Sequence, residues 1–331
     1  MEKIIESENG KYIIRPYKNE DESKVLSLWK TAFGREMHPS LWRWKYLENP
    51  YNEQILLCED EKGQIAVLYG GIPYRANYKG ETVEINQLMD IMSHPEYRKT
   101  GLFIKTAYAF LDYAGKEKGV LFLYGFPGEY HLRIGEKYLS YQAIRSGVRF
   151  LKIRVAALAD IKTPELYRAG KIKEVAHTDE SFDIVWKKCV KDYPLSIIRD
   201  AAFVQWRFFE HPFHTYEIWS YYFQGSPAGY AVFTVSGKTA RMVDMLAPCS
   251  AEIINTFLAE IGKVYARKNI EFLETWLPSS HFLSHSLQTM GFQTAPEPFG
   301  FIPTGRLFEN SLSGDWVSEN LFYTMGDGDL L

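Results

Sequence analysis

The chain has 331 residues, enough for two domains, and its 46% hydrophobic and 24% charged residues are typical of a folded protein without a membrane span. A net charge of −3 gives no basic footprint for DNA or RNA, so we expect no nucleic-acid partner. The three cysteines, Cys58, Cys189 and Cys249, lie too far apart to indicate a disulfide framework or a zinc site, and we expect a cytoplasmic protein.

The first half of the chain predicts alternating strands and helices. Branched and aromatic residues before Pro16 indicate a strand at 12–15, and the apolar face after Asn19 predicts a helix that ends at Gly34. A second helical stretch is expected around 42–46. Apolar alternation, turn residues and one apolar stripe then predict strands at 54–58, 64–74 and 82–92, a helix through 103–114 and a strand at 120–124. This order favours an α/β fold with a mixed sheet.

A second copy of the pattern follows the first. The segment WKYLENPY from Trp44 is similar to WRFFEHPF from Trp206, an offset of 206 − 44 = 162 residues, and a turn glycine after each segment keeps this offset. Farther on, MDIM around Asp90 is similar to VDML around Asp244. Three matches in the same order predict a tandem duplication.

The duplication sets the expected domain boundaries. We predict a first domain over 1–150, a linker at 151–172, a second domain over 173–300 and a tail at 301–331. The linker is chosen for its polar and helix-breaking residues, and Leu321–Tyr323 could add one more strand.

One loop of the first copy has the composition of a phosphate site. Strand 82–92 leads through Arg98, Lys99, Thr100 and Gly101 into a helix, where backbone N–H groups and two side-chain cations would face one anion. Gly101 has no Cβ to keep a ligand away from the backbone. The tetrapeptide alone is more typical of an ordinary solvated turn between a strand and a helix, so its context decides.

In that context the first half resembles a GCN5-related N-acetyltransferase (GNAT) domain. The residues Arg98-Lys99-Thr100-Gly101-Leu102-Phe103 match the family signature Gln/Arg-x-x-Gly-x-Gly/Ala except at Phe103, and MDIMSHPEYR and GFPG flank them as in the family. The resemblance implies two tandem acyl-CoA N-acyltransferase folds. The second copy is degenerate, because its corresponding loop has neither Arg nor Gly.

The resemblance also implies where acetyl-CoA would bind. In the family the loop amides, here those of 98–103, hold the pyrophosphate, and the strand backbone, here near Ile91 and Met92, pairs with pantetheine. One acetyl-CoA site per chain is expected. The second copy would either shape the acceptor side or only support the first sheet.

Acyl transfer to an amine needs a group that accepts the ammonium proton and often one that protonates the leaving thiolate. Alternation along strand 82–92 puts Glu84, Leu88, Asp90 and Met92 on one face. Asp90 is therefore a candidate base, and Glu84 is a second choice. Asp90 is equally open to a structural role, because Asp244 stands at the same place in the copy without the loop.

The resemblance implies a further candidate. Family members often have a tyrosine four residues before a helix-ending glycine, and the count from Gly135 gives His131, with Tyr130 beside it. Histidine can donate or accept a proton near neutral pH. Direct attack without a dedicated acid also remains open.

The sequence thus predicts an N-acetyltransferase that moves an acetyl group from acetyl-CoA to a primary amine of a small molecule or peptide, without a metal or a membrane. One alternative is a tRNA-dependent aminoacyl transferase of similar paired fold, which the charge balance disfavours. Another is a non-catalytic acyl-CoA-binding module, favoured if Phe103 blocks placement of the thioester.

Overall fold

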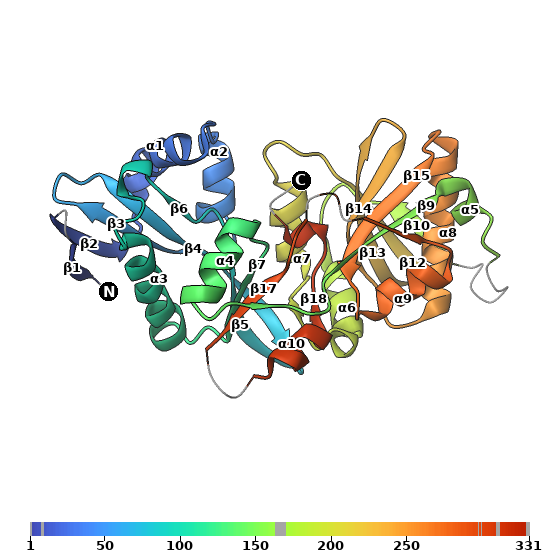
Figure 1. The fold of residues 1–331 in the computed structure, drawn as a ribbon. Helices are drawn as coiled ribbons and strands as arrows, with labels where there is room; N and C mark the ends of the chain where they lie inside the picture. The colour runs from blue at the N-terminus through green and yellow to red at the C-terminus, as the bar shows by residue number, and fades with distance from the viewer. Residues whose placement is uncertain are drawn as a thin grey trace. The chain divides into compact units, whose positions relative to one another are not determined.

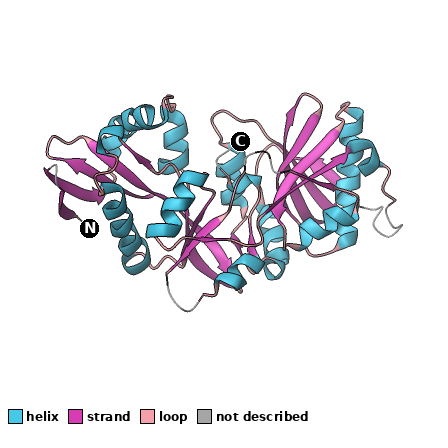
Figure 2. Ribbon diagram, viewed as in Figure 1, coloured by secondary structure: helices cyan, strands magenta, loops and turns pink. Residues whose placement is uncertain are grey.

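A computed structural model describes residues 2–7, 10–162, 170–296, 298, 300–308 and 312–328. The chain divides into two compact units, each a sheet with helices packed on it (Figures 1 and 2). Unit 1 consists of Met1–Arg75, Val83–Ala143 and Pro303–Leu312, and unit 2 consists of Ala76–Thr82, Ile144–Ile302 and Ser313–Leu331. No helix in the described ranges is both long and apolar enough to cross a bilayer.

The sheet of unit 1 is mixed. Its strands run in the order β1 (Lys3–Ser7), β2 (Gly10–Pro16), β3 (Gln54–Asp60), β4 (Ile65–Tyr78), β5 (Glu81–Leu88), β7 (Phe122–Gly125), β17 (Thr304–Leu307) and β8 (Gln142–Ala143). Strand β6 (Met92–Ser93) pairs with β4, and β5 and β7 are parallel. The helices are α1 (Glu22–Phe33), α2 (Pro39–Trp42), α3 (Leu102–Asp112) and α4 (Glu129–Tyr138).

The apolar stripe of α3 forms the main core of unit 1 with one face of this sheet. Phe110 and Ala107 pack there with Leu56, Val67 and Tyr69, all buried. Helix α1 begins at Glu22, after a 3-10 turn over Asn19–Asp21, and ends as predicted at Gly34, whose φ is +72°. Alternation and helical periodicity therefore predicted most of these elements to within a few residues.

Unit 2 repeats the arrangement. Its sheet has the order β10 (Lys171–Glu174), β12 (Glu217–Phe223), β13 (Ser226–Ser236), β14 (Thr239–Leu246), β15 (Phe272–Pro278), β9 (Val148–Arg154) and β16 (Gln293–Ala295). Strands β11 (Leu195–Ile197) and β18 (Leu321–Phe322) pair with each other, and β11 also pairs with the end of β4. The helices are α5 (Val155–Ala159), α6 (Glu180–Cys189), α7 (Ala201–Val204), α8 (Ala251–Arg267), α9 (Phe282–Thr289) and α10 (Gly314–Asn320).

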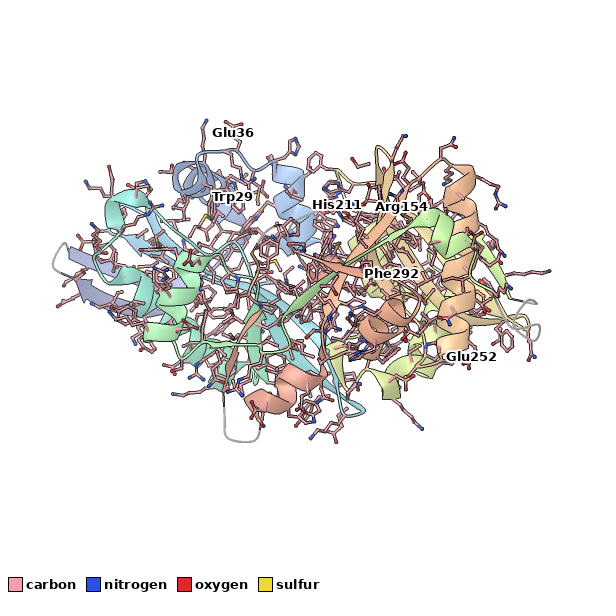
Figure 3. All side chains as sticks on the ribbon, turned by 45° about the vertical axis from the view of Figure 1, so that its right-hand side comes forward. Trp29, Glu36, Arg154, His211, Glu252 and Phe292 are labelled. Atoms are coloured by element: carbon pink, nitrogen blue, oxygen red, sulfur yellow. The ribbon has the colours of Figure 1, made fainter. Side chains whose placement is uncertain are left out.

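The two sheets share one topology, as the duplication predicts. Each has a parallel pair, β5 with β7 and β14 with β15, and each repeated WKYLENP-like segment forms a π-helical turn, Arg43–Leu47 in one unit and Gln205–Phe209 in the other. The side chains of Trp29 in α1 and Phe292 before β16 are buried in their respective units (Figure 3).

Each unit completes its sheet with a strand that lies far away in sequence. Strand β17 follows unit 2 in the chain but inserts between β7 and β8, whereas β9 follows unit 1 and inserts between β15 and β16. The halves of the chain have thus exchanged one strand each. Sequence periodicity carries no signal for such an exchange, because it reports local structure only.

This exchange corrects the expected boundaries. Residues 151–154 are not linker but part of β9, where Leu151 is fully buried and pairs with Thr275. Residues 163–169 of the expected linker lie outside the described residues, as do 309–311 and 329–331 of the expected tail. The rest of that tail supplies β17 to unit 1 and β18, which confirms the strand expected near Leu321.

Candidate functional site

Strands β5 and β7 pair over a short stretch and then separate. The last paired residues are Gln87 and Tyr124. Beyond them β5 ends at Leu88, and the chain resumes as β6 at Met92, hydrogen-bonded to β4. A parallel pair that parts in this way leaves the facing backbone edge open to a ligand.

The predicted strand 82–92 is interrupted at Asp90. This residue has a φ of +55°, in the left-handed region, and lies between β5 and β6. The expected alternation therefore stops at Leu88, because a left-handed residue breaks the two-residue period. The prediction that Leu88, Asp90 and Met92 share one face is wrong.

The Asp90 carboxylate is held by two donors from the π-helical turn. Lys45 Nζ lies 2.5 Å from Asp90 Oδ2, and the Tyr46 hydroxyl lies 2.6 Å from the same oxygen. The side chains of Lys45 and Asp90 are 4% and 6% exposed. This buried ion pair holds the carboxylate in place. Sequence reasoning missed Lys45 and Tyr46, although the repeated WKYLENPY segment contains both.

The loop after β6 has a fixed backbone shape. Lys99 and Gly101 have φ values of +68° and +79°. Between them, the Thr100 hydroxyl donates to the Tyr97 carbonyl at 2.6 Å, and the Thr100 carbonyl accepts from the Ser7 hydroxyl at 3.2 Å. Alternating left-handed residues turn successive N–H groups toward one side and form a concave site for an anion.

Gly101 is the N-cap of α3, and no side chain caps this helix. Among the described residues, the backbone N–H groups of 99–104 find no acceptor. A Cβ built on Gly101 would meet no atom within 4 Å, so the space beside this residue is open. Lys99 is exposed beside them, and Arg98 donates to the Ala32 carbonyl at 3.4 Å. Donors and open space fit a pyrophosphate group.

The two residues after Gly101 belong to the core. Leu102 is fully buried. The Phe103 ring packs between Tyr69, at a centroid distance of 5.6 Å, and His131, at 5.8 Å. The Phe103 ring, which departs from the family signature, therefore packs on the inner side of α3. The backbone N–H of Phe103 remains among the N–H groups of 99–104 that find no acceptor within the described part of the chain.

The structure separates the two helical candidates. The His131 ring faces Phe103 and Tyr141, and burial lowers the pKa of His131 below its ordinary value of 6.5. Tyr130 is 80% exposed. Of the two side chains, His131 alone reaches the interior beside the first turn of α3.

The count that selected His131 began at the wrong residue. Gly135 lies inside α4, where a Cβ would clash with the Tyr141 ring. The left-handed residue that ends the helix is Ser140, with φ of +55°, as Gly291 is in unit 2. A count of four from Ser140 gives 140 − 4 = 136, the exposed Glu136. Serine in place of glycine hid this turn in the sequence.

Glu84 lies in the paired part of β5, before the divergence. Its carboxylate accepts from Gln54 Nε2 at 2.6 Å, and its carbonyl accepts from the Leu121 N–H at 2.8 Å. Burial raises the pKa of Glu84. The structure therefore does not bring Glu84 to the point where β5 and β7 part.

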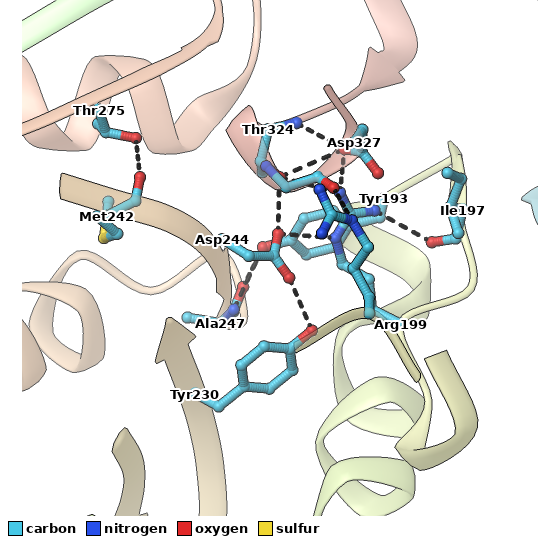
Figure 4. A network of polar contacts seen from close by, with 12 residues as sticks. Tyr193, Ile197, Arg199, Tyr230, Met242, Asp244, Ala247, Thr275, Thr324 and Asp327 are labelled. Atoms are coloured by element: carbon cyan, nitrogen blue, oxygen red, sulfur yellow. Dashed lines mark hydrogen bonds and ion pairs between the residues drawn. The ribbon is translucent and has the colours of Figure 1, made fainter. Parts of the chain in front are cut away.

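Unit 2 fills the corresponding places with contacts of its own. Ser250 caps α8 by accepting from the Ile253 N–H at 3.3 Å. Asp244, in the middle of β14, accepts from Arg199 Nε and from the Tyr230 hydroxyl, each at 3.0 Å (Figure 4). The features of an anion site are therefore found in unit 1. No group of three or more His, Cys, Asp or Glu side chains in the described ranges could hold a metal ion.

Comparison with known proteins agrees with this geometry. Residues 13–138 match a family model described as "Acetyltransferase (GNAT) domain". No curated protein matches the chain in sequence.

Solved structures share the fold over most of the chain. One is a probable N-acyltransferase of unknown function from Enterococcus faecalis V583, with a TM-score of 0.72, 17% identity, and 90% of this chain and 73% of that one covered. Another is a GCN5-related N-acetyltransferase from Anabaena variabilis ATCC 29413, with a TM-score of 0.70, 15% identity and the same coverages. A third, from Kribbella flavida, has a TM-score of 0.66, 12% identity, and 89% and 71% covered. Residues 13–138 therefore match the acetyltransferase (GNAT) domain family, and the solved structures show that about 90% of the chain shares the fold of these proteins.

Proposed function

We propose that this chain is an acetyl-CoA-dependent N-acetyltransferase whose acceptor is a primary amine of a small molecule or peptide. One observation carries the proposal: an open row of backbone N–H groups at the start of α3 follows directly on the strand edge that β7 leaves free. Acetyl-CoA carries a pyrophosphate joined to the extended, amide-bearing pantetheine arm. The N–H groups suit the pyrophosphate and the free strand edge suits the arm.

The residues divide the binding between them. The N–H groups of 99–104 and the Lys99 ammonium would hold the pyrophosphate, with Arg98 adding charge nearby. The backbone at Ile91 and Met92 would pair with pantetheine, because their side chains pack inward: Met92 is 3% exposed and Ile91 contacts the core of unit 1.

The transfer itself needs few protein groups. The amine nitrogen attacks the thioester carbonyl, an N–C bond forms and the C–S bond breaks; the amine loses one proton, and the thiolate takes one up. We propose His131 as the group that accepts the amine proton, because its lowered pKa keeps the ring neutral at pH 7. Asp90 is already held by Lys45 and Tyr46, which supports a structural role for that carboxylate.

The first test is calorimetric titration of the full chain with acetyl-CoA. We expect one site per chain, followed by thiol release when a panel of primary amines is added. Absence of binding at millimolar acetyl-CoA would contradict the proposal.

A second candidate function follows from the surroundings of His131. The His131 ring packs against the rings of Phe103 and Tyr141, and the Asp90 carboxylate is held by Lys45, so a binding module for acyl-CoA would have the same acyl-donor site without proton transfer. Acetyl-CoA binding without thiol release across the amine panel would favour this module.

A further inference from the structure

The left-handed backbone at Asp90 requires support from its surroundings. Residues other than glycine adopt positive φ at a cost, although Asp tolerates it better than most. At Asp90 this conformation separates β5 from β6, so the course of the strand edge depends on it. Lys45 and Tyr46 both donate to the Asp90 carboxylate and thereby hold this residue in place.

Two consecutive residues of a π-helical turn reach one oxygen atom. Lys45 and Tyr46 lie in the turn Arg43–Leu47, and both donate to Asp90 Oδ2. Such turns occur frequently at functional sites.

Unit 2 offers an internal comparison. Arg207 stands at the place of Lys45, but it donates to the carbonyls of Gly326 and Gly328, at 2.7 and 3.0 Å. Asp244, the counterpart of Asp90, lies within strand β14, where it pairs with Val232 beside a register shift of the ladder that does not interrupt the strand. The broken strand and the cation from the π-turn therefore occur together in the unit with the anion loop, and both are missing from this place in the unit without it.

We propose that Lys45 and Tyr46 are positioning residues for the acyl donor: by holding the Asp90 carboxylate they fix its left-handed backbone and keep the edge at Ile91 and Met92 open to pantetheine. This inference rests on the proposed function, because it assigns the donor to that edge. It gives the repeated WKYLENPY segment a role in unit 1 beyond packing.

Two matched substitutions test the proposal. Tyr46→Phe and Tyr230→Phe each remove one tyrosine hydroxyl that donates to a buried aspartate, Asp90 in unit 1 and Asp244 in unit 2. Both should lower the melting temperature. Only Tyr46→Phe should raise the Kd and KM for acetyl-CoA, by about tenfold for a lost charged hydrogen bond, with the KM for the amine unchanged. Equal effects of the two variants, or wild-type affinity in Tyr46→Phe, would overturn the proposal.

A conservative variant separates positioning from proton transfer. Asp90→Asn keeps an acceptor oxygen and a residue that tolerates positive φ, so kcat should keep the wild-type pH profile. Asp90→Ala keeps neither and should lose affinity for acetyl-CoA. Loss of the acidic limb of the pH profile in Asp90→Asn would instead make Asp90 the proton acceptor and refute the positioning role.

A readout without ligand distinguishes this inference from the proposed function. Amide hydrogen exchange over 88–93 should be faster in Tyr46→Phe than in wild type and unchanged in Tyr230→Phe. If the wild-type chain does not bind acetyl-CoA, the proposed function fails, and hydrogen exchange alone decides whether Lys45 and Tyr46 fix the backbone at Asp90. Unchanged exchange in Tyr46→Phe refutes this positioning role whatever the chain binds.

Discussion

Gly101 and Ser250 are the N-cap residues of corresponding helices, α3 in unit 1 and α8 in unit 2, and of the two only Ser250 caps its helix with a side-chain oxygen, which accepts from the Ile253 N–H. Each helix follows the strand region that carries one of two corresponding aspartates, Asp90 in unit 1 and Asp244 in unit 2. One helix start is closed by its own side chain, and the other leaves its N–H groups to an external anion. The duplication has thus kept the fold in both units and an open helix start in one.

The first prediction concerns Gly101. Gly101→Asp should weaken acetyl-CoA binding by at least about a hundredfold, because it puts a negative charge where the pyrophosphate would lie. No atom lies within 4 Å of the added Cβ, so the effect does not come from a clash within the protein. Calorimetry measures the change.

The control for Gly101 is Gly101→Asn. Asparagine tolerates a φ of +79° and adds similar bulk without charge, so its affinity should stay within about tenfold of wild type. Equal loss in the Asn and Asp variants would show that bulk or backbone strain dominates, and a wild-type affinity for Gly101→Asp would remove the loop from the site.

Lys99 provides a second, electrostatic prediction. Lys99→Asn keeps a residue suited to the φ of +68° but removes an exposed charge, and the Kd for acetyl-CoA should rise about threefold to tenfold at low salt. The difference from wild type should shrink at 0.5 M salt because of screening. Titrations at two salt concentrations measure both effects. A difference that does not depend on salt would indicate a structural role for Lys99.

His131 predicts a pH profile. Burial lowers the pKa of His131 below 6.5, so the loss of rate caused by protonation of this ring should occur below pH 6.5. His131→Phe preserves the aromatic packing against Phe103 and should lower kcat by about a hundredfold or more while acetyl-CoA still binds. A variant with wild-type kcat would indicate attack without a dedicated base.

Arg15 joins Asp21 and Glu59 in a buried cluster and gives a prediction for stability. Arg15 donates to both Asp21 oxygens, at 2.7 and 2.9 Å, and the Asp21 side chain is 4% exposed. Burial acts to raise the pKa of Asp21, but the hydrogen bonds from Arg15 and the Lys18 N–H outweigh it, and the net pKa is lowered. Asp21→Asn should lower the free energy of unfolding at pH 7 by about 1 to 2 kcal/mol.

The pH dependence of that difference follows from the lowered pKa. A carboxyl with a lower pKa in the folded state stabilises the protein above its unfolded value, about 3.9, and loses this contribution as the pH falls through the folded value. The gap between wild type and Asp21→Asn in urea unfolding should therefore be constant near pH 7 and close below about pH 4. Glu36→Gln, at an exposed ion pair with Lys30, is the control and should leave the midpoint unchanged. A gap of the same size at pH 3 as at pH 7 would contradict this reading of the cluster.

Several features followed from the sequence because they depend on local chemistry. Gly34 and Gly101 adopt the positive φ values that only glycine reaches easily, and the strands around the turns at Gly63 and Gly80 follow their apolar alternation. The duplication was visible because packing preserved Trp44 and Trp206, both buried. The loop at 98–103, which is proposed to bind phosphate, could be predicted from the sequence because its residues are contiguous.

Other features depend on residues far apart in the chain. Asp90 adopts a positive φ within a run that alternates like a strand, and Lys45 and Tyr46 reach it across more than 40 residues of sequence. Ser140, and not a glycine, adopts the left-handed conformation after α4. The count of four residues therefore started at Gly135, which lies inside the helix, and gave His131.

The sequence by itself determined the fold class, the repeat and the left-handed backbone at Gly101 in the loop proposed to bind an anion, because each is set by the backbone preferences and periodicity of neighbouring residues. The tertiary structure alone decided the exchange of β9 and β17, the break at Asp90 and which candidates face the interior. Those depend on which side chains and strand edges meet once the sheets close, and contacts between distant residues leave no local pattern in one sequence.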